Sequence, residues 1–317
     1  MHEQPGHDSG QPPAGLSWGE LVASLVAAHG TLTAVAWKLI EHGDDVASIE
    51  RALRRLRTRG QLDGGMWGQR VLRVFGVPAS VESRLRWMGL YHSPFTDLPL
   101  PLCQDQLRLW DRPPVSESRA RVWLHLGQAS CALRQRDHAA ARRYVDLAAG
   151  THDDTARVEA ELVLAYIASH TGGDAAAHLD RVTFTDAVAP PDRACFEARL
   201  VDQRAYQLNR RDEHAAARAL YDALPDEDVH PFASYRRDAG RAWGQFRAGE
   251  TAQAIALATR AIEHAGDGGY TRLRAMGLLM LARFGGGAEL VTRAHAIATR
   301  LEDIELLARV ARHRGDV

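Results

Sequence analysis

Fifteen histidines and three cysteines are the side chains of this sequence that could ligate a metal or transfer protons near neutral pH. Their spacing argues against both roles. There is no H-E-x-x-H motif, and Cys103, Cys131 and Cys195 are far apart and form no C-x-x-C pair. Residues 285–287 are three glycines without the following Lys and Ser or Thr of a phosphate-binding loop, and no G-x-S-x-G nucleophile elbow occurs. We therefore expect no catalytic residue, no metal and no cofactor, and a protein that is not an enzyme.

Arginines near the N-terminus could do a different chemistry, the binding of phosphates and base edges. Between Ser48 and Val74 seven arginines face only two carboxylates, Glu50 and Asp63. A guanidinium group can hold a phosphate or a guanine through two hydrogen bonds. The predicted DNA-binding residues are Arg51, Arg54, Arg55, Arg57, Arg59, Arg70 and Arg73. The alternative is an ordinary solvated helix surface, or a surface that binds protein.

The composition of the whole chain limits these readings. Lys and Arg number 39 against 40 Asp and Glu, so no chain-wide field attracts nucleic acid or an anionic membrane. Lys38 is the only lysine, and a GC-rich genome is the simpler reason for so many arginines. No apolar run reaches the ~20 residues that span a bilayer, and the cysteines fit a reducing compartment. We expect a cytoplasmic protein without a membrane partner.

Short helices must position the N-terminal arginines. Residues 1–16 are polar and rich in Gly and Pro, and we expect a disordered tail. Ser17 and Glu20 form an S-x-x-E capping box that predicts a helix to His29. Thr31 or Thr33 can cap a second helix, and Asp44 or Asp45 a third that ends near Gly60.

The next segment has two interpretations. In residues 61–74 an Asp-Gly-Gly sequence between apolar residues favours a β-hairpin, the wing of a winged helix. A fourth helix from Trp67 to Phe75, with Val71 and Leu72 on its apolar side, is the alternative. With either one, residues 17–77 resemble a helix-turn-helix domain, in which the third helix enters the major groove. We expect Trp18, Trp37 and Trp67 in its core.

Residues 78–117 form a proline-rich segment that limits regular structure to short helices. The segment contains large apolar side chains, among them Trp87, Tyr91, Phe95 and Trp110. We therefore expect a packed connector between two domains and not a free linker.

Residues 118–317 contain an internal repeat. The anchors Ala141, Ala217 and Ala254 are 76 and 37 residues apart, which predicts helix pairs at intervals of about 38 residues. The first unit carries Trp123-x-x-Leu126-Gly127, and these residues resemble the W-x-x-L-G signature of the tetratricopeptide repeat (TPR) family. The resemblance covers about 200 residues and implies an all-α fold, an α-solenoid of about five helical hairpins.

Such a solenoid has a concave groove that binds a peptide or protein. The polar residues that we place in this groove are Arg199, Gln203, Arg236, Arg237 and Arg241, although a solvated helix face is the simpler reading for each arginine.

The order of the two domains is similar to that of peptide-sensing regulators of Gram-positive bacteria. The similarity implies a bacterial DNA-binding transcriptional regulator whose superhelix binds a peptide or protein partner or mediates homodimerisation. The alternative is a TPR adaptor or scaffold with no nucleic-acid function.

Overall fold

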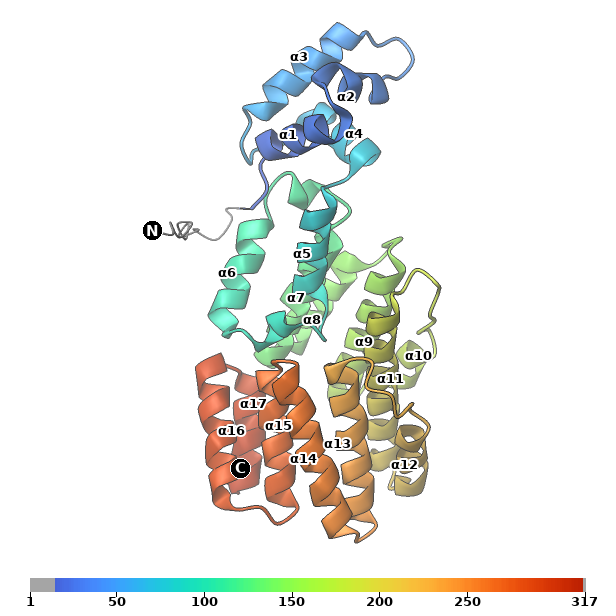
Figure 1. The fold of residues 1–317 in the computed structure, drawn as a ribbon, viewed down its shortest axis with the longest axis vertical. Helices are drawn as coiled ribbons and strands as arrows, with labels where there is room; N and C mark the ends of the chain where they lie inside the picture. The colour runs from blue at the N-terminus through green and yellow to red at the C-terminus, as the bar shows by residue number, and fades with distance from the viewer. Residues whose placement is uncertain (1–14, 316–317) are drawn as a thin grey trace, which may run out of the picture. The chain divides into compact units, whose positions relative to one another are not determined.

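The computed structural model describes residues 15–315, and these residues form helices joined by turns, with no strand among them (Figure 1). The prediction of an all-α fold is confirmed. The predicted tail, residues 1–16, lies outside the described residues except for Gly15 and Leu16. Within 15–315 no single helix is long and apolar enough to cross a membrane, and the only candidate by length and composition is a pair of helices bent by 93° near the N-terminus.

The chain divides into two compact units. Unit 1 consists of residues up to 85 together with 105–121, and unit 2 of residues 86–104 and those from 122 onward. The proline-rich segment 78–117 therefore contributes to both units.

Unit 1 begins with three helices, α1 (Trp18–His29), α2 (Leu32–Lys38) and α3 (Val46–Arg57), whose predicted starts are confirmed. Ser17 and Glu20 form the capping box of α1. The side chains of Thr31 and Asp45 accept hydrogen bonds from the first turns of α2 and α3, at 3.0 and 2.8 Å. Each cap is local in sequence, which is why the sequence alone revealed it.

The predicted hairpin over residues 61–74 is wrong, because this segment forms a helix, α4 (Gly65–Phe75). The glycines that suggested a turn serve packing instead. A Cβ atom at Gly64 or Gly68 would lie 2.2 or 2.7 Å from the ring of Trp18, the fully buried centre of unit 1. Only glycine lets α4 approach this ring so closely. The prediction for Trp37 is also wrong, since 62% of this residue is exposed.

The chain then passes through α5 (Ala79–Gly89), a short 3-10 turn η1 (Pro94–Asp97), α6 (Leu100–Trp110) and a second 3-10 turn η2 (Val115–Glu117). The division between the two units falls within α5 and α6.

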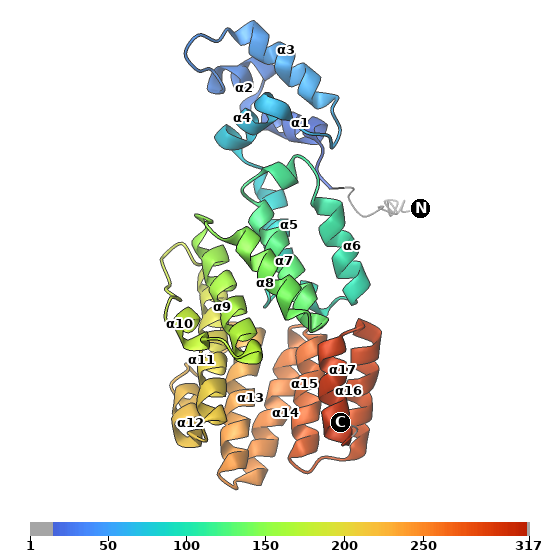
Figure 2. The ribbon, with the colours of Figure 1, turned by 180° about the vertical axis from the view of Figure 1, so that it is seen from behind.

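Unit 2 continues with helices that alternate in two rows (Figure 2). We call the first row the inner helices, because they line a cavity: α7 (Arg121–Arg134), α9 (Asp154–Thr171), α11 (Pro190–Arg210), α13 (Pro231–Arg247), α15 (Thr271–Arg283) and α17 (Ile304–Arg314). The outer helices are α8 (His138–Ala148), α10 (Ala175–Leu179), α12 (His214–Asp222), α14 (Thr251–Asp267) and α16 (Ala288–Leu301). The anchor alanines 141, 217 and 254 are buried in outer helices, where a small side chain permits close packing.

Helices α9 and α11 run in the same direction, and α15 and α17 begin side by side, where Arg272 donates to Asp303. From α9 to α11, Glu159 contacts Arg199, the carbonyl of Leu162 contacts Gln203, and Ser169 contacts Gln207, so positions advance together along both helices. The carboxyl end of α7, in contrast, lies at the start of α17, because Arg134, the last residue of α7, donates to Asp303.

Candidate functional site: the cavity of unit 2

A cavity of about 870 Å³ lies among the inner helices, and all of its lining residues belong to unit 2. Its size falls within the range of small-molecule sites, ~300–1,000 Å³. Aromatic and apolar side chains form its middle wall, including Tyr166, Tyr206, Tyr235, Met276 and Leu279. Eight arginines line it, against a single carboxylate, Asp202. The cavity is thus apolar in the middle and basic overall.

A turn after α5 closes the end of the cavity where α15 and α17 begin. The Tyr91 hydroxyl accepts a hydrogen bond from Arg272 Nη1 at 2.9 Å, and the guanidinium of Arg199 lies 4.8 Å from its ring centre. The backbone N–H of Tyr91 donates to Glu159 Oε2 at 3.3 Å, and Tyr270 donates its hydroxyl proton to the carbonyl of His92 at 2.9 Å. We call this closed end the floor.

Buried carboxylates neutralise the arginines at and near the floor. Arg199 makes two hydrogen bonds to Glu159, at 2.6 and 2.8 Å, and Glu159 is fully buried. Asp303, at the start of α17, accepts from both Arg134 and Arg272. Two further pairs complete the set: Arg236 with Asp202 at 2.5 Å, and Arg309 with Glu305 at 2.9 Å. Except for Arg309 and Glu305, which both belong to α17, these paired charges join different inner helices.

The electrostatics of the floor follow from this arrangement. Burial by itself would raise the pKa of Tyr91, but the positive charges of Arg272, Arg236 and Arg199 outweigh it and lower that pKa. Burial would likewise raise the pKa of Asp303, and the charges of Arg272 and Arg134 lower it instead. Both shifts come from the arginines that lie beside these two groups.

The other end of the cavity, where α11, α15 and α17 end, is different. Arg210, Arg283 and Arg312 line it, all three are exposed, and among residues 15–315 none makes an ion pair. Arg210 donates to the carbonyl of Ser169 at 3.0 Å, and the guanidinium of Arg283 lies 5.1 Å from the ring centre of Trp243. We call this end the mouth.

Three of the five predicted groove residues line the cavity: Arg199, Gln203 and Arg236. Arg237 and Arg241 do not, because acidic residues of the α12–α13 loop and of α13 hold them elsewhere. Arg237 pairs with Asp228 and Asp238, both at 2.9 Å.

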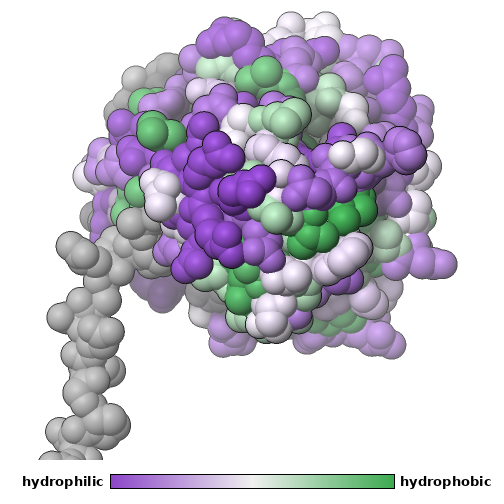
Figure 3. Space-filling view, turned by 90° about the horizontal axis from the view of Figure 1, so that it is seen from above, coloured by the Kyte–Doolittle hydropathy of each residue, from purple (hydrophilic) through white to green (hydrophobic). Residues whose placement is uncertain are grey.

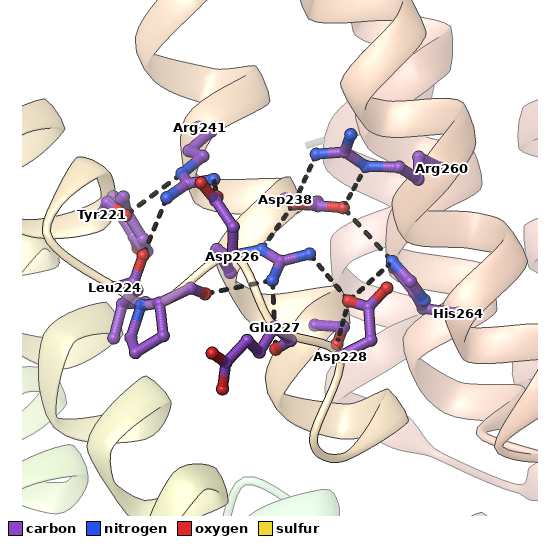
Figure 4. A network of polar contacts seen from close by, with 12 residues as sticks. Tyr221, Leu224, Asp226, Glu227, Asp228, Asp238, Arg241, Arg260 and His264 are labelled. Atoms are coloured by element: carbon purple, nitrogen blue, oxygen red, sulfur yellow. Dashed lines mark hydrogen bonds and ion pairs between the residues drawn. The ribbon is translucent and has the colours of Figure 1, made fainter.

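Figure 4 shows the network that these two arginines join. Arg241 pairs with Asp226 at 2.5 Å and donates to the carbonyl of Leu224 at 2.9 Å, while Asp238 also binds Arg260 of α14 at 2.5 Å. The network ties a loop to two helices, and neither Arg237 nor Arg241 lines the cavity of unit 2.

The sequence reasoning missed Tyr91, Glu159 and Asp202, and no local signal identifies them. Tyr91 lies in the proline-rich segment, 181 residues from its partner Arg272. Glu159 and Asp202 each pair with an arginine on the next inner helix. Such a pair can be predicted only when the register between the two helices is known.

The predicted DNA-binding arginines lie on two helices of unit 1. Arg51, Arg54, Arg55, Arg57 and Arg59 are exposed on or just after α3. The opposite face of α3 is buried through Ile49, Ala52, Leu53 and Leu56. Figure 3 looks onto the face of unit 1 that carries α2 and α3, where hydrophilic side chains surround smaller apolar patches.

Arg70 and Arg73 lie on α4 and not on a wing. Only 9% of the Arg70 side chain is exposed, and it pairs with Asp44 at 2.5 Å and stacks over Trp67. Arg73 is exposed and pairs with Glu41 at 2.6 Å. Both arginines fasten α4 to the turn between α2 and α3, so the prediction that they contact DNA from a wing was wrong in its geometry.

Within residues 15–315 no three His, Cys, Asp or Glu side chains come together as a metal site requires. Compared with family models, with curated proteins and with solved structures, the chain matches none.

Proposed function

We propose that this protein is a DNA-binding transcriptional regulator. Unit 1 binds DNA through α3 in the manner of a helix-turn-helix domain. Unit 2 is a TPR-like superhelix whose cavity binds a partner that controls unit 1, and a homodimer would present two α3 helices to two DNA half-sites.

The observation that carries the proposal is the exposed face of α3. Arg51, Arg54 and Arg55 follow the i, i+3, i+4 spacing that places side chains on one side of a helix, with the buried residues on the other. The Arg54 side chain is exposed, although that of its partner Glu50, 2.7 Å away, is largely buried, and ion pairs at a surface contribute little stability. These guanidinium groups can therefore exchange their present contacts for phosphates or base edges at low cost.

The test is enrichment of pooled genomic DNA fragments by the full-length protein at ~50 and ~200 mM salt. We expect selective enrichment that weakens with salt and is lost when Arg51, Arg54 and Arg55 are all changed to Ala. The matched control changes Arg142, Arg143 and Arg300, exposed arginines of unit 2, to Ala and removes the same charge. Enrichment that is equal in both variants contradicts the proposal.

One observation favours a second candidate, an adaptor that binds proteins through unit 1. Trp37, Leu62 and Met66 of unit 1 expose 62%, 71% and 71% of their surface, and exposed aromatic side chains can anchor a protein partner. If no DNA fragment is enriched, changing Trp37 to Ser should instead abolish the capture of a protein partner by the full-length chain.

A further inference from the structure

The cavity of unit 2 contains polar groups that its own fold leaves unused. Arg236 Nε, Gln203 Oε1 and Ser130 Oγ are buried, line the cavity, and have no hydrogen-bond partner among residues 15–315. Arg236 is 9% exposed and Ser130 5%. Leaving a buried donor or acceptor unpaired costs free energy, so three such groups around one cavity indicate a ligand that pairs with them.

The unpaired charges of the cavity lie at one end only. At the floor, carboxylates neutralise the arginines, as with Glu159 and Arg199. At the mouth, Arg210, Arg283 and Arg312 have no carboxylate partner within residues 15–315. His170 and His313 also line the mouth, and they add no negative charge there. Burial lowers the pKa of both, and for His313 the charges of Arg283 and Arg312 lower it further.

The floor limits the shape of the ligand. Tyr91 closes the end opposite the mouth through its contacts with Arg272 and Glu159. A ligand that enters through the mouth therefore meets Tyr91 at the far end of the cavity. The volume of about 870 Å³ admits a compact molecule and not a folded helix.

We propose that the cavity binds a compact organic anion end-on. The acidic head, a carboxylate or a phosphate, lies among Arg210, Arg283 and Arg312, and the apolar or aromatic body lies along the middle wall. A polar atom at the inner end of the ligand pairs with Arg236 Nε or Gln203 Oε1. This inference rests on the proposed role of unit 2 as the ligand-binding part, but it does not require that unit 1 bind DNA.

The direct test compares two fluorescent probes that share their aromatic rings and differ in charge. 8-Anilinonaphthalene-1-sulfonate carries an acidic group, and N-phenyl-1-naphthylamine carries none. We expect the full-length protein to bind the sulfonate at least tenfold more tightly, since a hydrogen bond to a charged group corresponds to about a factor of ten. Equal affinities for the two probes overturn the proposal.

Variants then locate the probe. The double change R283Q/R312Q should weaken sulfonate binding about tenfold and leave binding of the neutral probe within about twofold. The matched control R142Q/R143Q, on exposed arginines of α8, should change neither affinity. A thermal melt of each variant, followed by circular dichroism, checks that the variant is folded. If the mouth variant binds the sulfonate as tightly as the control does, the proposal fails.

Filling the cavity gives an independent readout. Ala239 lines the middle of the cavity, and A239W should abolish binding of both probes in a protein that still melts cooperatively. Retention of sulfonate binding by folded A239W places the probe elsewhere and overturns the proposal.

Displacement of the sulfonate identifies the acidic head. Dodecanoate offers a carboxylate on an apolar body, and adenosine monophosphate offers a phosphate on an aromatic one. Displacement by either supports the proposal and names the head group, while displacement by neither contradicts it. These experiments contain no DNA, so their failure leaves the DNA-binding proposal standing, and failure of DNA enrichment leaves this inference standing.

Discussion

Arg134 of α7 donates a hydrogen bond to Asp303 at the start of α17 over 3.1 Å, although 169 residues separate them in the sequence. Asp303 also accepts from Arg272 and caps α17 through the N–H of Leu306, at 2.9 Å. One fully buried carboxylate thus links the first, fifth and last inner helices and helps to form the cavity.

Changing Asp303 to Asn should destabilise the protein by about 3–5 kcal/mol, because Asn keeps the shape but leaves two buried guanidinium groups without their negative partner. Urea unfolding followed by circular dichroism measures the change. In the control, Asp146→Asn removes an exposed pair with Arg142 and should cost less than ~1 kcal/mol. Similar losses of unfolding free energy in the two variants would show that the buried carboxylate contributes no more stability than an exposed one.

Gly240 of α13 should not tolerate a methyl group. A Cβ atom there would lie 2.0 Å from the ring of Tyr221, whose hydroxyl donates to Asp202 at 2.8 Å. Gly240→Ala should therefore lower stability by about 1–3 kcal/mol.

Gly266 of α14 provides the matched control, because nothing lies within 4 Å of its added Cβ. Gly266→Ala should raise stability by about 0.5–1 kcal/mol through the higher helix propensity of Ala. The melting temperatures of the two variants should therefore shift in opposite directions, and a shift in the same direction is incompatible with this packing.

Asp97 should make stability depend on pH between about 4 and 6. Burial raises its pKa from 3.8 to about 6, although the N–H of Arg272 donates to its Oδ1. The folded state therefore holds a proton that the unfolded state has released, so stability falls as pH rises through this window, by up to about 3 kcal/mol.

Asp97→Asn keeps the acceptor and removes the titration. Its unfolding free energy, measured at pH 4 and pH 7, should fall less over this range than that of the natural protein. Identical pH dependence in the two proteins would rule out Asp97 as the titrating group.

Arg70 should matter for the stability of unit 1. Its side chain is nearly buried and joins α4 to Asp44, so Arg70→Ala should cost about 1–3 kcal/mol. Arg73→Ala removes an exposed pair with Glu41 and should cost less than ~1 kcal/mol. Thermal melts of both variants check the difference, and equal stabilities would mean that the buried pair is replaced by other contacts.

The sequence predicted the parts of the fold that depend on neighbouring residues. Ser17, Thr31 and Asp45 mark helix starts because each caps an amide within three positions. The sequence left α4 as the alternative to a hairpin, because the close packing of Gly64 and Gly68 against Trp18, more than forty positions away, is not visible in it.

The same distinction applies to the cavity. Arg199 and Arg236, which we placed in the groove as polar residues, line the cavity, but Arg237, one residue further, turns to a loop carboxylate at Asp228. Helical periodicity predicts on which face of a helix a side chain lies. It does not predict which acidic residue of a distant loop will pair with that side chain. Tyr91 was invisible for the same reason, because its partners lie on helices far along the chain.

The most direct test of the central claim is the salt dependence of binding to an enriched DNA fragment. Each phosphate contact contributes about −0.9 to the slope of log K against log salt concentration. With Arg51, Arg54 and Arg55 changed to Ala, we predict that the slope becomes shallower by up to about 2.7, while the charge-matched variant of Arg142, Arg143 and Arg300 keeps the slope of the natural protein. An unchanged slope in the α3 variant would contradict the claim that these arginines bind DNA.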